Sequence, residues 1–344
     1  MKAKTETERE KKSKSKSGEV RGSTISPRDH RQVLCGPFRT LCSPRDSQEY
    51  LTFLSSFCNV YKNQSEDKDF SGVGVAEATA IVRNISSRMG SAAAGVLAKE
   101  LQVVFILCRS DDHKVLFAEH GALEETIAAL HRFAAHPDVL VQGFKALINM
   151  GKNDRAKSII GAHGAPAIIV QAMHDFKDLS EVQQVGTWCL GSIVVVHMEN
   201  KHISGEANAP ETILDVMKAF PGNIELQQVC LWAIGSLCAN FPSNGVRVGK
   251  KGGISLIVQA MKVFADIPSI QEMGCWALAN LAACGGKVAE KIESKDGPQA
   301  IMAAMRTHEK HPNLQYAGLV ALAHLGSPSA IEKFLALPAF AYFQ

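Results

Sequence analysis

At 344 residues the chain exceeds a typical single globular core, so it forms either two domains or one elongated array that grows by repetition. It is 46% hydrophobic and 21% charged, an ordinary composition for a soluble protein with much apolar surface to bury. The formal charge is +3, but residues 1–30 hold nine Lys and Arg against five Asp and Glu, so the remaining 314 residues carry about −1. A body so close to neutrality argues against broad, phosphate-driven nucleic-acid binding, which needs many cations on one face.

The first segment, residues 1–30, alternates Lys with Ser at positions 12–17 and is predicted to be a disordered basic tail. Three hypotheses for it stand open: a solvated linker, a basic patch of the nuclear-localisation type, or a tail that folds back onto the body and is released by serine phosphorylation. It contains no apolar signal core, and no later stretch offers the roughly 18 apolar residues of a membrane span. The nine cysteines lack CxxC spacing, which indicates a reducing compartment, so we expect a cytoplasmic protein, with nuclear, cytoskeletal or ciliary sites as alternatives.

Residues 31–95 contain two helical runs, 46–61 and 75–89, that do not follow the periodicity described next. They are predicted to form an N-terminal helical cap. The repeat array is then expected to occupy 96–344, as about five repeats and a partial one.

The array is recognised by a period of about 44 residues. Trp188, Trp232 and Trp276 are spaced by 44 and 44 residues, and a small polar residue follows each of them four positions later. Those followers are Ser192, Ser236 and Asn280. One unit further each way, the same frame gives Lys145 with Asn149 and Val320 with His324.

Two more columns keep the period. An apolar residue opens each of these segments, at Val139, Val182, Leu226, Ile270 and Leu314. A bend residue lies between segments, predicted at Gly121, Gly164, Asn208, Gly253 and Gly297. Gly, and less readily Asn, accept the left-handed backbone that turns a chain sharply at a helix end.

Amphipathic runs follow the bends, at 165–174, 209–217 and 253–261, and they are predicted to be middle helices. Pro166, Pro210 and Pro298 stand directly behind the bend, where a missing N–H costs nothing in the first helical turn. The unit is therefore a short helix, a bend, a middle helix and a long third helix. No strand pattern competes, and the apolar run 193–196 is expected to be core, so the fold class is all-α: a superhelix of stacked repeats with one concave wall.

Residues 270–283, IQEMGCWALANLAA, resemble the third-helix signature of the armadillo family, of the kind found in importin alpha and beta-catenin. The resemblance extends over about 96–325 and implies that the superhelix is right-handed. It implies that third helices line a groove, that Trp188, Trp232 and Trp276 form shelves for a ligand's side chains, and that Asn149 and Asn280 hydrogen-bond the ligand's extended backbone.

The sequence also departs from that pattern. Ser192 and Ser236 replace asparagine, and a hydroxyl cannot bridge a peptide's N–H and C=O as a carboxamide can. Lys145 replaces tryptophan at the first groove position, and Val320 and His324 depart at the other end.

These features predict a non-enzymatic scaffold that binds an extended segment or a helix of another protein along the groove. No catalytic, nucleotide-binding or metal-ligand motif is present, so no cofactor or metal is expected. Core packing of the tryptophans is an equally weighted alternative. A structural brace in a cytoskeletal or ciliary assembly is also an open hypothesis. Nuclear-transport cargo adaptation is another, although the small repeat count and the lack of acidic residues around Trp232 disfavour it.

The end of the chain contains a helical run at 327–335 followed by aromatics at 340–343. This apolar end suggests docking to a partner or to a second copy.

Overall fold

The computed structural model describes residues 55, 94–109, 114, 117 and 121–326. These residues form α-helices and turns without any strand, which confirms the all-α class. The predicted tail at 1–30, nearly all of the predicted cap at 31–95, and the segments 327–335 and 340–343 lie outside the described residues.

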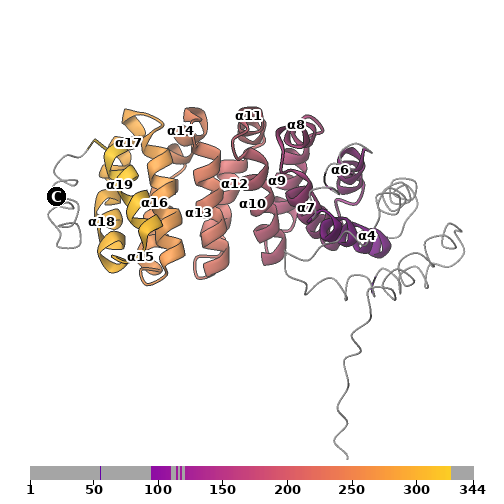
Figure 1. The fold of residues 1–344 in the computed structure, drawn as a ribbon, viewed down its shortest axis with the longest axis horizontal. Helices are drawn as coiled ribbons and strands as arrows, with labels where there is room; N and C mark the ends of the chain where they lie inside the picture. The colour runs from indigo at the N-terminus through magenta and orange to yellow at the C-terminus, as the bar shows by residue number, and fades with distance from the viewer. Residues whose placement is uncertain (1–54, 56–93, 110–113, 115–116, 118–120, 327–344) are drawn as a thin grey trace, which may run out of the picture.

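The helices fall into three sets that recur in the same order along the chain (Figure 1). The first helices are α8 (Asp154–Ala162), α11 (Met198–Glu206), α14 (Pro242–Lys250) and α17 (Gly286–Glu293). The second helices are α6 (Ala122–Arg132), α9 (Ala165–Asp175), α12 (Ala209–Ala219), α15 (Gly253–Val263) and α18 (Gly297–Thr307). The third helices are α4 (Ala94–Leu107), α7 (Pro137–Met150), α10 (Ser180–Val194), α13 (Ile224–Cys238), α16 (Pro268–Ala282) and α19 (Pro312–His324).

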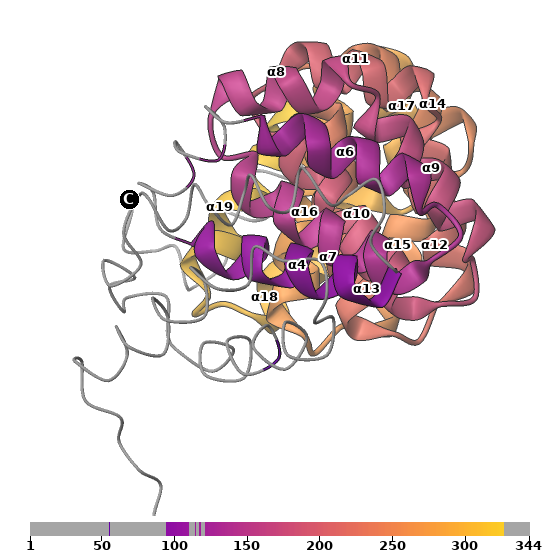
Figure 2. The same cartoon turned by 90° about the vertical axis from the view of Figure 1, so that its right-hand side faces the viewer.

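Each set stacks on its own kind. Third helices contact each other in the order α4, α7, α10, α13, α16 and α19, and the first and second helices form parallel rows beside them. Figure 2 looks along these rows, with α8, α11, α14 and α17 gathered on one side of the array. The buried apolar side chains of all three rows join in one continuous core. A single repeat cannot cover its own apolar faces, so stacking is what makes the core.

Left-handed residues make the bends, with φ between 61° and 84° at Gly121, Gly164, Asn208, Gly252 and Asp296. The predicted column was therefore one residue late at Gly253 and Gly297, which begin helices α15 and α18. These two glycines serve packing instead. A Cβ at Gly253 would lie 2.5 Å from a methyl of Val248, and one at Gly297 would lie 2.3 Å from a methyl of Ile292.

The apolar run 193–196 was only partly predicted correctly. Ile193 and Val194 are buried, but α10 ends at Val194 and Val196 is 84% exposed. Val196 has φ of 55°, the same turn that Asn240 makes with φ of 54° after α13, one repeat later. The chain must turn here to begin the next first helix, and this turn carries the fourth residue of the run out of the core.

Four buried glutamines connect the second helices to the third helices. The Nε2 of each glutamine donates to two carbonyl oxygens at the end of the preceding second helix, at 2.7–3.0 Å. They are Gln183, Gln227, Gln271 and Gln315. The last carbonyls of a helix lack partners within it, so each glutamine supplies a donor to an otherwise unpaired carbonyl. The second carbonyl of each pair also accepts a backbone N–H from the turn that follows.

Candidate binding groove

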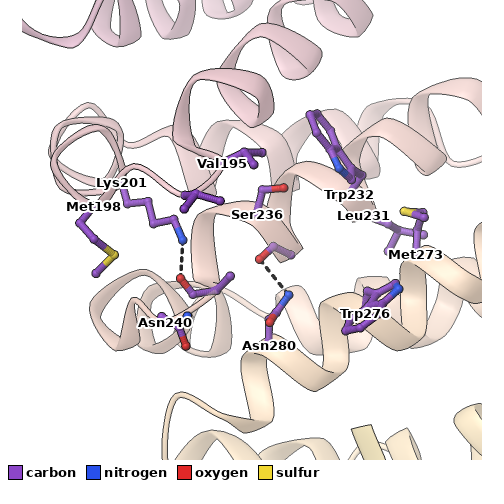
Figure 3. Close-up of a pocket in the computed structure, with 13 residues that line it drawn as sticks. Val195, Met198, Lys201, Leu231, Trp232, Ser236, Asn240, Met273, Trp276 and Asn280 are labelled. Atoms are coloured by element: carbon purple, nitrogen blue, oxygen red, sulfur yellow. Dashed lines mark hydrogen bonds between the residues drawn. The ribbon is translucent and has the colours of Figure 1, made fainter. Parts of the chain in front are cut away.

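Two adjoining clefts lie on the third-helix face. The first cleft, of about 480 Å³, is bounded by α11, α13, α16 and the turns that follow α10 and α13 (Figure 3). The second cleft, of about 420 Å³, is bounded by α10, α13 and α16. Trp232 and Met273 line both clefts, so the two form one groove divided by these side chains.

The three tryptophans follow this groove on three consecutive third helices. Trp188 is 46% exposed and lines the second cleft, Trp276 lines the first cleft, and Trp232 stands between them. Trp232 and Trp276 are only partly buried against the core. All three indoles therefore line the groove, and Trp232 and Trp276 also pack against the core.

The Trp232 ring lies directly over Gly191 of the preceding third helix. A Cβ at position 191 would approach the ring to 2.3 Å, so only glycine leaves room for the indole there. Trp276 is supported from the other side by Tyr316 of α19, with ring centroids 5.7 Å apart in an edge-to-face arrangement.

Tyr316, which is 61% exposed, extends the aromatic row but was not predicted. It stands one helical turn before Val320, the position that the 44-residue frame selects, and Val320 itself packs against the core. A search for aromatic residues one turn to either side of the tryptophan column would have found it.

The predicted backbone clamps bind the chain itself. Asn149 Nδ2 donates to the carbonyl of Phe105 at 2.9 Å, and Asn280 Nδ2 donates to that of Gly235 at 3.2 Å. His324 Nδ1 lies 3.1 Å from the carbonyl oxygen of Ala279. In each case the side chain of one third helix reaches the backbone of the third helix before it, so the contacts hold neighbouring repeats in register.

The other predicted groove residues divide between the clefts and their surroundings. Ser236 and Asn280 line the first cleft. Ser192, partly buried on α10, lines neither cleft. Lys145 forms an ion pair with Glu181 at 3.1 Å, so this cation ties α7 to α10. The structure therefore brings together Trp188, Trp232, Ser236, Trp276 and Asn280, and leaves Lys145, Asn149, Ser192 and His324 outside both linings.

An acidic side chain does lie beside the tryptophans, contrary to the reading of the sequence. Glu225 lines the second cleft together with Trp188 and Trp232. It precedes Trp232 by seven residues, two turns of the same helix, which places both on one face. A search confined to the immediate neighbours of Trp232 misses it.

One cation lines the first cleft, and it too was missed. Lys201 of α11 is 3% exposed, and its Nζ donates to the carbonyl of Ala239 at the end of α13 (Figure 3). Burial lowers the pKa of this ammonium group. The contact crosses 38 residues of sequence, so no local pattern announces it.

The buried cysteines Cys230 and Cys275 lie in surroundings that disfavour a reactive thiolate. Burial raises the pKa of Cys230 to about 12, and that of Cys275 also to about 12, with a smaller contribution from Glu272 at Cys275. Thiols with such pKa values stay protonated at neutral pH and behave as small apolar groups. No group of His, Cys, Asp or Glu in the described part of the chain is arranged to hold a metal ion, and no helix there is long and apolar enough to cross a membrane.

Stacked three-helix units with a groove along their third helices define the class of α-solenoids. Solved structures identify the particular fold. An engineered protein superposes with a TM-score of 0.64 at 17% identity, covering 72% of this chain and 96% of its own. A designed armadillo repeat protein in complex with the peptide (KR)4 gives 0.60 at 19% identity, covering 71% and 99%.

A chain from a structure of the interaction between cadherin and beta-catenin gives a TM-score of 0.51 at 15% identity, covering 88% of this chain and 62% of its own. No protein-family model and no curated protein sequence matches the chain. The chain has the armadillo-repeat fold, as its third-helix signature predicted.

Proposed function

We propose that the protein is a non-enzymatic scaffold that binds an extended segment of another protein along the groove on α10, α13 and α16. The observation that carries this function is the row of partly exposed indoles, Trp188, Trp232 and Trp276, around two adjoining clefts. Tryptophan is enriched among the residues that dominate binding energies, because its rigid ring buries much area at small entropic cost. A helix of the partner is the alternative ligand.

The dimensions of the groove support a peptide ligand. Clefts of about 420 and 480 Å³ fall within the range of specific ligand sites, and neither is an enclosed cavity. A designed protein of the same fold is in complex with a peptide. A cytoplasmic site of action is part of the proposal, and imaging of the tagged full chain in cells tests it.

Trp232→Ala tests the groove, because this ring contributes to both clefts. We expect the variant to lose the partners that the wild type retains in affinity purification followed by mass spectrometry, and to bind any purified partner at least tenfold more weakly. Helical circular dichroism should be unchanged. Val263→Ala is the matched control, since Val263 is 54% exposed on α15 and lines neither cleft.

Retention of every partner by folded Trp232→Ala would contradict groove binding. The structural brace, which uses other faces of the array, would then be the better proposal.

A second candidate function, nuclear-transport cargo adaptation, gains support from Glu225 in the second cleft. A carboxylate beside two indoles suits the lysine or arginine of a basic cargo segment. A lysine-rich nuclear-localisation peptide should then bind the wild type and bind Glu225→Gln more weakly. No binding of this peptide to the wild type would remove the candidate.

A further inference from the structure

The first cleft contains a single charge. Of the thirteen described residues that line it, only Lys201 is ionisable near neutral pH as a cation, and none is an acid. No carboxylate among the described residues lies within 4.0 Å of its Nζ, and its one hydrogen bond goes to a neutral carbonyl, that of Ala239. Lysines are almost never this deeply buried unless an anion pairs with them.

The hydrogen bond from Lys201 to Ala239 has a structural role, because the preceding repeat contains an equivalent bond. Lys157, 44 residues earlier, also donates from Nζ to the carbonyl that follows a third helix, that of Val195, at 2.6 Å. Both lysines therefore complete the end of a third helix, where carbonyls lack partners. Of the two, only Lys201 lines either of the two clefts described above. The role at the helix end thus explains the geometry that Lys157 and Lys201 share, but it does not explain the cleft beside Lys201.

The other residues that line the first cleft suit a ligand in which a small anionic group lies next to an apolar group. Ser236, Asn240 and Asn280 add polar side chains near Lys201, while Trp232, Trp276 and Met273 form an apolar wall (Figure 3). An ammonium group has three donors, and one is used by Ala239. A carboxylate would satisfy another donor and would compensate the buried charge.

We propose that the first cleft receives the side-chain carboxylate of an Asp or Glu in the bound segment, which accepts a hydrogen bond from Lys201 while a neighbouring apolar side chain contacts Trp232 and Trp276. This inference rests on the proposed function and names the chemistry of its partner. Glu225 in the second cleft repels an acid there, so the two clefts differ in charge on either side of Trp232. The difference fixes the direction in which a segment lies along the groove.

Selection from a random linear-peptide phage library on the full chain provides the probe. Selected peptides that require Trp232 should share an Asp or Glu. For one synthetic peptide, measured by fluorescence anisotropy, we expect Lys201→Met to weaken binding about 30-fold. Replacing the acid of the peptide by its amide should weaken binding to the wild type equally, and should have little further effect on the variant. Lys157→Met, which removes the equivalent helix-end contact outside the clefts, should leave the affinity unchanged.

Peptides that require Trp232 but contain no shared acid would overturn this inference and leave the proposed function intact. Equal loss from the peptide's amide substitution in wild type and Lys201→Met would also overturn it. Loss of binding on amidation of the peptide's C-terminus, with the side-chain acid dispensable, would overturn the assignment to Asp or Glu. Selection of no Trp232-dependent peptide would count against the proposed function itself. If Lys201→Met does not fold, two measurements still test the inference. They are the effect of the peptide's acid-to-amide change on its affinity for the wild type, and the affinity of the peptide for the charge-retaining variant Lys201→Arg.

Discussion

Val196 adopts a backbone conformation that β-branched residues avoid, because the left-handed region brings their Cβ against the carbonyl oxygen. The side chain gains nothing by burial, since it is 84% exposed at the rim of the first cleft. Asn240 makes the same turn one repeat later with a residue type that tolerates it. Backbone strain of this kind is frequent at functional sites.

Replacing Val196 by asparagine should therefore stabilise the protein by about 0.5–1 kcal/mol. Chemical denaturation of the two proteins measures the difference. If Val196 is retained for its contact with the bound segment, the stabilised variant should also bind its partner more weakly. An unchanged or lower stability would show that the turn is not strained by valine.

At the scale of the helix, the glutamine contacts hold each second helix against the third helix that follows it. Gln227 is 2% exposed and is bonded to the carbonyls of Met217 and Phe220, at 2.9 and 3.0 Å. Those two oxygens lie at the end of α12, where nothing else in the helix can reach them. In α7 the same position is Leu140, so only the repeats from α10 onward have the contact.

Gln227→Leu should destabilise the protein by about 1–2 kcal/mol, because it leaves the buried carbonyl of Met217 without a donor and removes one of two donors to that of Phe220, while keeping a similar volume. The free energy of unfolding in urea measures this loss. Gln171→Leu is the control, since Gln171 is exposed on α9 and bonds only Asp175. Equal effects of the two substitutions would mean that the buried bonds contribute no more than surface ones.

The fold was predictable because the same sequence pattern recurs in about five successive repeats. Where adjacent residues compete for one role, the period alone does not choose between them: Gly252 and Gly253 both permit a left-handed turn, and only the position of Val248 shows which is needed for packing. The glutamine column keeps the 44-residue spacing and was open to detection. Lys201 was not, because its role depends on a carbonyl from the next repeat.

At the scale of the whole molecule, one continuous core runs through the array and contains free thiols on successive third helices. They include Cys189 on α10, Cys230 and Cys238 on α13, and Cys275 on α16. Burial is the main cause of the raised pKa at each of them. Unfolding returns these thiols to a pKa of 9.0.

Stability should consequently fall at alkaline pH. Above pH 9.0 the unfolded chain loses thiol protons that the folded chain keeps until about pH 12, so the contribution of Cys230 is complete below that window and is lost through it. Each such thiol contributes a slope of up to about 1.4 kcal/mol per pH unit. The lowered pKa of Lys201 acts in the opposite direction, but it is one group against several.

Guanidinium denaturation at about pH 8 and about pH 10 measures this effect. Cys230→Ala should lose less stability between the two conditions than the wild type does. Parallel losses in the two proteins would contradict the role of the buried thiol.

The seat that Gly191 provides for Trp232 has a consequence for recognition. The indole packs against the backbone of the preceding repeat, and a side chain held in place before binding lowers the entropic cost of association. The affinity of the groove should therefore depend on position 191, where the methyl group of an alanine would displace the indole from below the groove without contacting the ligand.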